Sequence, residues 1–115
     1  MARTQDTARP APPHPGRILR DRVLPGLDLS VSQAARELRI ARQTLHRILA
    51  GTLGISPEMA TRLARLSGTT SMFWLTLQHQ HDLWWAEQAL SGELSLIPTH
   101  SLPNAIRTEI GLHGE

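Results

Sequence analysis

Side chains that can read DNA bases gather on one short stretch of the sequence, between positions 42 and 47. They are Arg42, Gln43, Thr44, His46 and Arg47. Arginine can donate two parallel hydrogen bonds to guanine, and glutamine can form the corresponding pair with adenine. Threonine can contact a thymine methyl group or a phosphate. On one face of a helix, these residue types indicate a surface that enters the major groove of double-stranded DNA.

Two short helices joined by a tight turn, within residues 32–51, must position this face. The apolar residues there have the spacing that lets two short helices pack at a steep angle. They are Ala34, Leu38, Ile40, Leu45 and Ile48, and Ala35 is small enough for close approach. This pattern predicts a helix-turn-helix DNA reader.

The turn itself departs from the usual residue types. Arg39 occupies the position that favours a positive φ angle, where glycine is the ordinary choice. Ala41 occupies the N-cap of the recognition helix and has no side-chain acceptor, which costs on the order of 1 kcal/mol. Packing by Ile40, Leu45 and Ile48 must offset that cost. Ser32 is the expected N-cap of the preceding helix.

Phosphate contacts are expected from positions that flank the recognition helix. Gln33 lies in the first turn of the preceding helix, where its amide and the helix N-terminus can hold a phosphate. Thr52 and the backbone near Gly51 and Gly54 follow the recognition helix and could also bind phosphate, although the glycines could simply provide backbone flexibility at the helix end. Other arginines could extend the basic surface or could simply be exposed charges: Arg17, Arg20, Arg22 and Arg36.

Positive charge is concentrated in the first half of the chain. Every strong cation is an arginine, because the sequence contains no lysine. Residues 17–65 hold nine arginines and four carboxylates, whereas residues 66–115 hold one arginine and five carboxylates. This division suggests a nucleic-acid surface at one end and a different partner surface at the other, although ordinary solvated charge can also segregate.

Composition favours one all-α domain in the cytoplasm. The chain of 115 residues is long enough for a single compact domain with short tails. Strand signals are poor, since there is no tyrosine, one phenylalanine and little alternation. Cysteine is absent, no run of 18 apolar residues exists, and the N-terminus lacks the apolar region of a secretory signal. We therefore expect no membrane association.

Five helices are predicted from apolar spacing and capping residues. They cover approximately residues 15–24, 32–38, 42–50, 57–66 and 72–90. Pro25–Gly26 should end the first helix, Ser56 should cap the fourth, and Met59, Leu63 and Leu66 should form the buried side of the fourth.

Three regions are expected along the chain. Residues 1–13 should be a disordered arm, because they combine prolines with small and polar residues. Residues 14–91 should form the DNA-binding and dimerisation domain. Residues 92–115 should be mostly irregular, with 105–110 able to form a short helix.

Aromatic residues on the long helix offer a dimer contact. Phe73, Leu77, His81 and Trp84 lie close to one stripe at helical spacing. Core packing is the ordinary interpretation of Phe73, Trp74 and Leu77. Trp84 and Trp85 are adjacent and point in different directions, so a small monomer cannot easily bury both. Aromatic anchors concentrate at interfaces. The residues predicted for a symmetric dimer interface are Trp74, His81, Trp84 and Trp85.

No catalytic, metal or cofactor site is predicted. His79 and Asp82 can share a helix face, but two ligands without a third do not make a metal site. The sequence shows no paired carboxylates, no nucleophile beside a base and no phosphate-binding loop. We therefore expect a protein that is not an enzyme.

The chain resembles the HigA-type antitoxins of the Xre-like helix-turn-helix family, also described as addiction-module antidotes related to virulence-associated protein I. The motifs that carry the resemblance are HPG at 14–16, Leu19-Arg20, RQTL at 42–45, Gly51, ISPEMA at 55–60, Leu63-Ala64, Gly68-Thr69, FWLTLQ at 73–78 and DLW at 82–84. They span about residues 14–86. The ISPEMA and FWL-x-LQ segments are far more specific than a helix-turn-helix alone.

The resemblance implies a phage-repressor-like, five-helix domain that acts as a homodimer. Such a protein binds its own operator, represses its operon and neutralises a small, basic, RelE-like ribonuclease toxin of a type II toxin–antitoxin module. A repressor without a toxin partner remains the nearest alternative. An adaptor whose helix-turn-helix no longer binds DNA, and a small metal-dependent hydrolase that uses the histidines, are alternatives from other classes.

Overall fold

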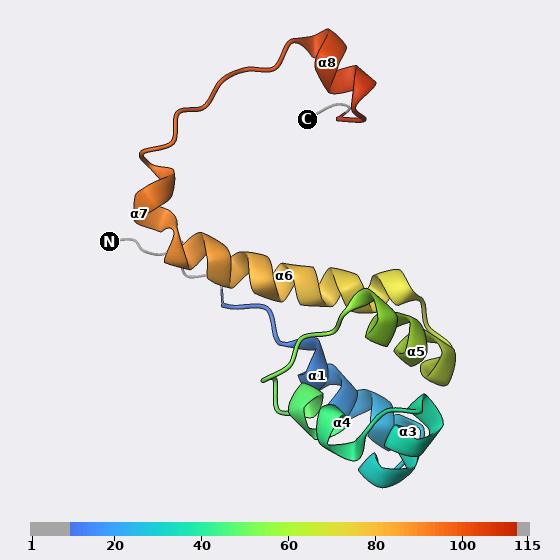
Figure 1. Ribbon diagram of the computed structural model, residues 1–115. Coiled ribbons are helices and arrows are strands. Elements are labelled where there is room, and N and C mark those ends of the chain that lie inside the picture. The colour runs from blue at the N-terminus through green and yellow to red at the C-terminus, as the bar shows by residue number, and fades with distance from the viewer. Residues whose placement is uncertain (1–9, 113–115) are drawn as a thin grey trace.

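The computed structural model describes residues 10–112, and helices are the regular secondary structure within that range (Figure 1). The elements are α1 (Pro15–Ile18), η2 (Leu19–Val23), α2 (Leu24–Gly26), α3 (Val31–Leu38), α4 (Arg42–Leu49), α5 (Pro57–Ser67), α6 (Ser71–Ala89), α7 (Ser91–Leu94) and α8 (Asn104–Glu109). The predicted all-α fold with five principal helical segments up to α6 is confirmed. None of the helices in the described range is long and apolar enough to span a membrane.

The first helical segment is continuous from Pro15 to Gly26 through α1, η2 and α2, so it ends at the predicted pair Pro25–Gly26, with both residues inside the last turn. The helix widens into a π turn just before that proline, where the Leu24 N–H donates to the carbonyl of Leu19 five residues back. Pro25 then takes an early position of α2 and needs no N–H there. Leu19 and Leu24 are buried and hold the segment to the core.

The start of α1 packs against the C-terminal end of α4. The side chain of His14 caps α1, because its Nδ1 accepts a hydrogen bond of 2.9 Å from the Gly16 N–H. A Cβ atom at position 16 would overlap the carbonyl oxygen of Ile48. Glycine is required here by the close approach of two helices.

Helix α3 begins earlier than predicted. Its N-cap is Ser30 rather than Ser32, and the Ser30 Oγ accepts a hydrogen bond of 3.1 Å from the Gln33 N–H. Two serines spaced by one residue are both acceptable caps by type. Burial of Ala34, Ala35 and Leu38 decides the phase of the helix.

Helices α5 and α6 form the second half of the core. Ser56 caps α5 as predicted, with its Oγ accepting a 3.2 Å hydrogen bond from the Met59 N–H. Leu63 is fully buried, whereas Met59 and Leu66 are half-buried. Gly68 ends α5 in the left-handed conformation at φ 71°.

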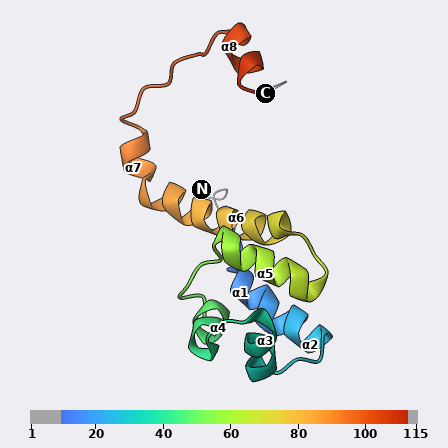
Figure 2. The ribbon, with the colours of Figure 1, turned by 45° about the vertical axis from the view of Figure 1, so that its right-hand side comes forward.

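Core packing involves only the first part of α6. Trp74 is completely buried, and its indole N–H donates to the Thr69 Oγ1 at 2.8 Å. Gln78 is also buried, and its side-chain oxygen accepts a 2.7 Å hydrogen bond from the Ile55 N–H. Beyond these residues, α6 projects away from the helix-turn-helix, as Figure 2 shows.

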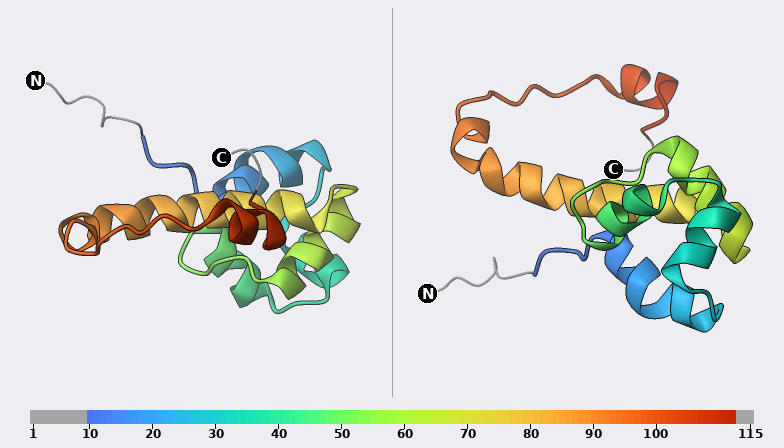
Figure 3. Two further views of the ribbon diagram at one scale, coloured as in Figure 1. Left: turned by 90° about the horizontal axis from the view of Figure 1, so that it is seen from above. Right: turned by 60° about the horizontal axis from the view of Figure 1, so that its bottom comes forward.

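The C-terminal segment lies apart from the helical body in Figure 1, and the view from above shows that it turns back along α6 (Figure 3, left). Helix α7 was not predicted, whereas α8 corresponds to the short helix expected at 105–110. Apart from the half-buried Arg107, residues 91–112 are exposed. The predicted disordered arm, 1–13, lies outside the described residues except for 10–13.

Candidate nucleic-acid interface

The turn between α3 and α4 has a left-handed residue that is not glycine. Arg39 adopts φ 61° and ψ 44°, as its place in the motif predicts. The Ile40 N–H then donates to the Ala35 carbonyl at 3.0 Å, and the Arg39 N–H donates to the Arg36 carbonyl at 3.1 Å. This arrangement resembles a Schellman end. The left-handed backbone costs a residue with a Cβ atom about 1 kcal/mol.

Packing rather than capping holds the recognition helix α4. Its N-cap is Ala41, which provides no side-chain hydrogen bond, as predicted. Leu45, Ile48 and Leu49 are buried on the inner face of α4. The direction of α4 therefore depends on the core below it and on the turn before it.

The outer face of α4 presents the predicted base-reading residues to solvent. Arg42, Gln43, His46 and Arg47 are exposed, and Thr44 is half-buried at the edge of the face. Within residues 10–112, no carboxylate lies within 4.0 Å of either arginine. The positive charge on this face is thus available to a nucleic acid.

Two predicted phosphate-binding residues already make contacts inside the chain. The side-chain amide of Gln33 donates to Glu37 Oε2 at 3.0 Å. The Thr52 Oγ1 donates to the Arg47 carbonyl at 3.2 Å, just after α4 ends. Gln33 lies in the first turn of α3 and Thr52 directly after α4, and each side chain would have to give up its internal hydrogen bond to contact a phosphate.

Arginines of the first helical segment contribute less free charge than their number suggests. Arg20 binds Asp21 at 2.7 Å, and Arg17 lies 4.0 Å from the same carboxylate. The hydrogen bond from Arg20 lowers the pKa of Asp21. Arg22 and Arg36 are exposed without an ion pair among the described residues.

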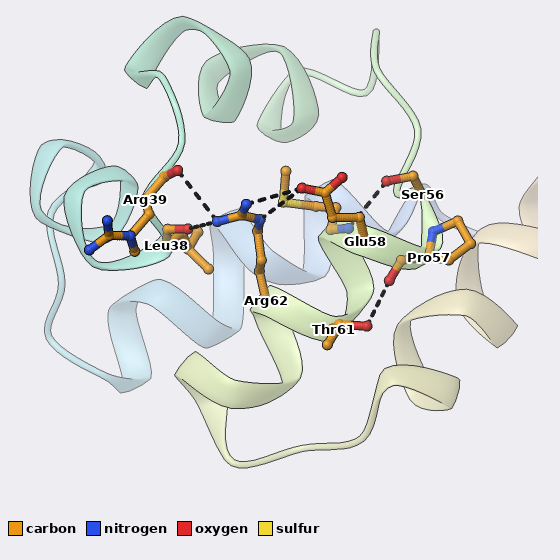
Figure 4. Close-up of polar contacts among 8 residues, drawn as sticks. Leu38, Arg39, Ser56, Pro57, Glu58, Thr61 and Arg62 are labelled. Carbon is orange, nitrogen blue, oxygen red and sulfur yellow. Dashed lines mark hydrogen bonds and ion pairs between the residues drawn. The ribbon is translucent and has the colours of Figure 1, made fainter.

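Sequence reasoning missed Arg62, which ties α5 to the turn (Figure 4). Its Nη1 donates to the Leu38 carbonyl at 2.7 Å and lies 3.4 Å from the Arg39 carbonyl. Glu58, one turn earlier on α5, accepts from the same guanidinium at 3.0 and 3.3 Å. The i, i+4 spacing of Glu58 and Arg62 is visible in the sequence, but the contact with a turn 23 residues away is not.

Comparison with known proteins places this site in a family. A family model described as a helix-turn-helix domain matches residues 17–71. The antitoxin HigA of Pseudomonas aeruginosa, solved with the higBA promoter, is 36% identical, and the match covers 79% of this chain and 99% of that chain with a TM-score of 0.73. A HigA-family antidote protein from Coxiella burnetii is 33% identical over 80% of this chain and all of its own, also with a TM-score of 0.73.

The chain belongs to the HigA family of helix-turn-helix antitoxins. Virulence-associated protein I of Dichelobacter nodosus is 34% identical over 74% of this chain and 79% of its own length. The chain spans 63–64% of the length of two other curated relatives, virulence-associated protein A' of the same organism and a helix-turn-helix regulator of Haemophilus influenzae.

The four predicted dimer residues of this HigA-family chain lie on α6 and differ in their exposure to solvent. Trp74 has no exposed surface and lies in the core, so its side chain cannot contact a second copy. His81 is half-buried, with its Nδ1 2.8 Å from the Pro12 carbonyl oxygen. Trp84 is half-buried and Trp85 is 54% exposed. Phe73 was expected in the core but is 42% exposed, packed edge-on against Trp74.

A pair of histidines joins this part of α6 to the start of α1. The rings of His14 and His81 lie edge to face with centroids 5.1 Å apart. Burial lowers the pKa of His14, and the positive charge of a protonated His81 would lower it further. Neutral His14 is the form that can accept the Gly16 hydrogen bond. Within residues 10–112, no group of three potential ligands assembles that could bind a metal ion.

Proposed function

We propose that this chain is a homodimeric, operator-binding repressor and the antitoxin of a type II toxin–antitoxin module. It represses its own operon and neutralises a RelE-like ribonuclease toxin in the cytoplasm. The observation that carries the proposal is the exposed, unneutralised polar face of α4, in a chain whose relatives include HigA solved with promoter DNA. The relatives are named as antitoxins and transcriptional regulators, in line with a protein that is not an enzyme.

In this proposal the residues of α4 read bases and the flanking residues fix the helix on the DNA backbone. Arg42 or Arg47 donates a bidentate pair to guanine, Gln43 pairs with adenine, and Thr44 contacts a thymine methyl group or a phosphate. His46 lies on the same face of α4 and is proposed to fill space near the DNA backbone. Gln33 and Thr52 exchange their internal hydrogen bonds for phosphate oxygens.

Dimerisation through α6 would supply two such faces. A two-fold dimer places its recognition helices on half-sites about one helical turn, roughly 34 Å, apart. The exposed Trp85 with the half-buried Trp84 and His81 is the proposed contact, because aromatic side chains anchor interfaces efficiently. Two copies also explain how a modest basic face binds DNA with useful affinity.

The toxin is proposed to bind away from the DNA face, on the acidic second half of the chain. Residues 66–112 contain four carboxylates and one arginine. Such a surface repels phosphate and attracts a basic protein. A repressor without a toxin would need the α4 face and the helix α6, but not an acidic surface for a basic partner.

Two experiments test the proposal. The purified chain should select a palindromic duplex from a random-sequence pool, and recovery of no preferred sequence would contradict operator binding. Co-expression of this chain should restore the growth of cells inhibited by a RelE-like protein encoded beside it, and the two proteins should co-purify. Operator selection without growth rescue would favour the stand-alone repressor.

A further inference from the structure

Arg62 of α5 binds the backbone at the end of α3, directly before the recognition helix α4. The last carbonyls of a helix have no partner within the helix and carry partial negative charge. The Arg62 guanidinium donates to the Leu38 carbonyl at 2.7 Å and lies 3.4 Å from the carbonyl of Arg39. A cation from a different helix thus satisfies the backbone at the point where the chain reverses.

Arg39, whose carbonyl lies beside this guanidinium, has a strained backbone conformation. Arg39 holds the left-handed conformation at φ 61°, which favours glycine. Only three residues, 39–41, separate α3 from α4, and Ala41 adds no cap. A change in the conformation of residue 39 would therefore redirect α4.

Arg62 is itself held in place. Its two hydrogen bonds to Glu58, at 3.0 and 3.3 Å, fix the guanidinium plane on the surface of α5. The side chain is 35% exposed, against 77% for Glu58. The guanidinium already binds Leu38, Arg39 and Glu58 within the chain, so we do not assign it a phosphate contact.

We propose that Arg62, oriented by Glu58, is a positioning residue for the recognition helix: it substitutes for a turn glycine by holding Arg39 in its left-handed conformation. This inference rests on the proposed DNA binding. The two proposals can fail separately, since binding of the wild-type protein to a selected duplex tests DNA binding before any Arg62 variant is made.

The test compares variants on the duplex selected by the wild-type protein and on a scrambled duplex of equal length. Arg62→Met should lower the preference for the selected duplex about tenfold or more, while binding to scrambled DNA and the slope of log affinity against log salt remain unchanged. Arg65→Met is the matched control, because Arg65 is exposed on the same helix without an ion pair among the described residues, and it should retain the preference.

A second change separates positioning from a direct contact. Adding Arg39→Gly to Arg62→Met should restore most of the preference, because glycine adopts the left-handed conformation without help. A uniform loss on both duplexes with a salt slope smaller by about one would instead make Arg62 a phosphate contact. Such a uniform loss would overturn the proposal. So would a preference that is unchanged in Arg62→Met, or a preference that Arg39→Gly does not restore. If Arg62→Met does not fold, the same comparison applies to Arg62→Lys, which retains the charge but not the fork of donors.

Discussion

The two ends of this molecule use apolar residues in opposite ways. Between Leu19 and Trp74, most of the large apolar side chains form the core and leave a polar, basic face on α4; Leu27, Met72 and Phe73 are the exposed ones. From Leu90 onward, the apolar side chains are exposed, among them Leu96 at 75% and Ile110 at 61%. The first region completes its own fold and displays charge to a ligand. The second exposes apolar and acidic groups that the described part of the chain does not cover, as expected of a segment that binds a partner.

The largest expected contrast comes from one substitution made in both regions. Leu45→Ala removes a fully buried side chain and should reduce the free energy of unfolding by about 2–5 kcal/mol. Leu96→Ala should change it by less than about 0.5 kcal/mol, because that side chain is exposed. Urea unfolding monitored by tryptophan fluorescence measures both. Equal losses would remove the distinction between the two regions.

Removal of the C-terminal region should separate the two proposed activities. A chain ending at Leu90 loses no buried side chain from the described residues 91–112, so its binding to the selected duplex should stay within about threefold of that of the full chain, given the small cost of an exposed change. Growth rescue against the toxin should weaken, because part of the acidic apolar surface is gone. Fluorescence anisotropy and plating efficiency measure the two effects. A loss of DNA binding beside intact rescue would reverse our assignment of the regions.

A smaller effect is expected of pH on stability, through His14 where the start of α1 meets α6. His14 has a pKa below its ordinary value of 6.5 in the folded chain, so the unfolded chain binds the proton more readily. Stability should therefore be fully present above pH 6.5 and should decline as the pH falls below it. Thermal melts between pH 7.5 and pH 5 measure this change. His14→Asn keeps a capping acceptor without a titrating group and should flatten the profile; a profile that stayed equally steep would assign the effect to another group.

Local features of the sequence predicted much of this structure. Caps such as Ser56, the apolar phase of α4 and the left-handed Arg39 depend on neighbouring residues, and all three could be predicted. The burial of Trp74 against the exposure of Phe73 depends on which face of α6 meets α5, and helical spacing alone does not decide it. Contacts between distant residues, such as Arg62 with the turn and His81 with Pro12, required the fold.

The central claim is that the outer face of α4 reads base sequence, and the double variant Arg42→Ala/Arg47→Ala tests it most directly. The measurement is the ratio of affinities for the selected and the scrambled duplex, with circular dichroism to confirm that the fold is retained. Each bidentate contact contributes about 1–3 kcal/mol of discrimination, so loss of two contacts should lower the ratio by about 30-fold or more. A folded double variant that keeps the wild-type ratio would contradict it.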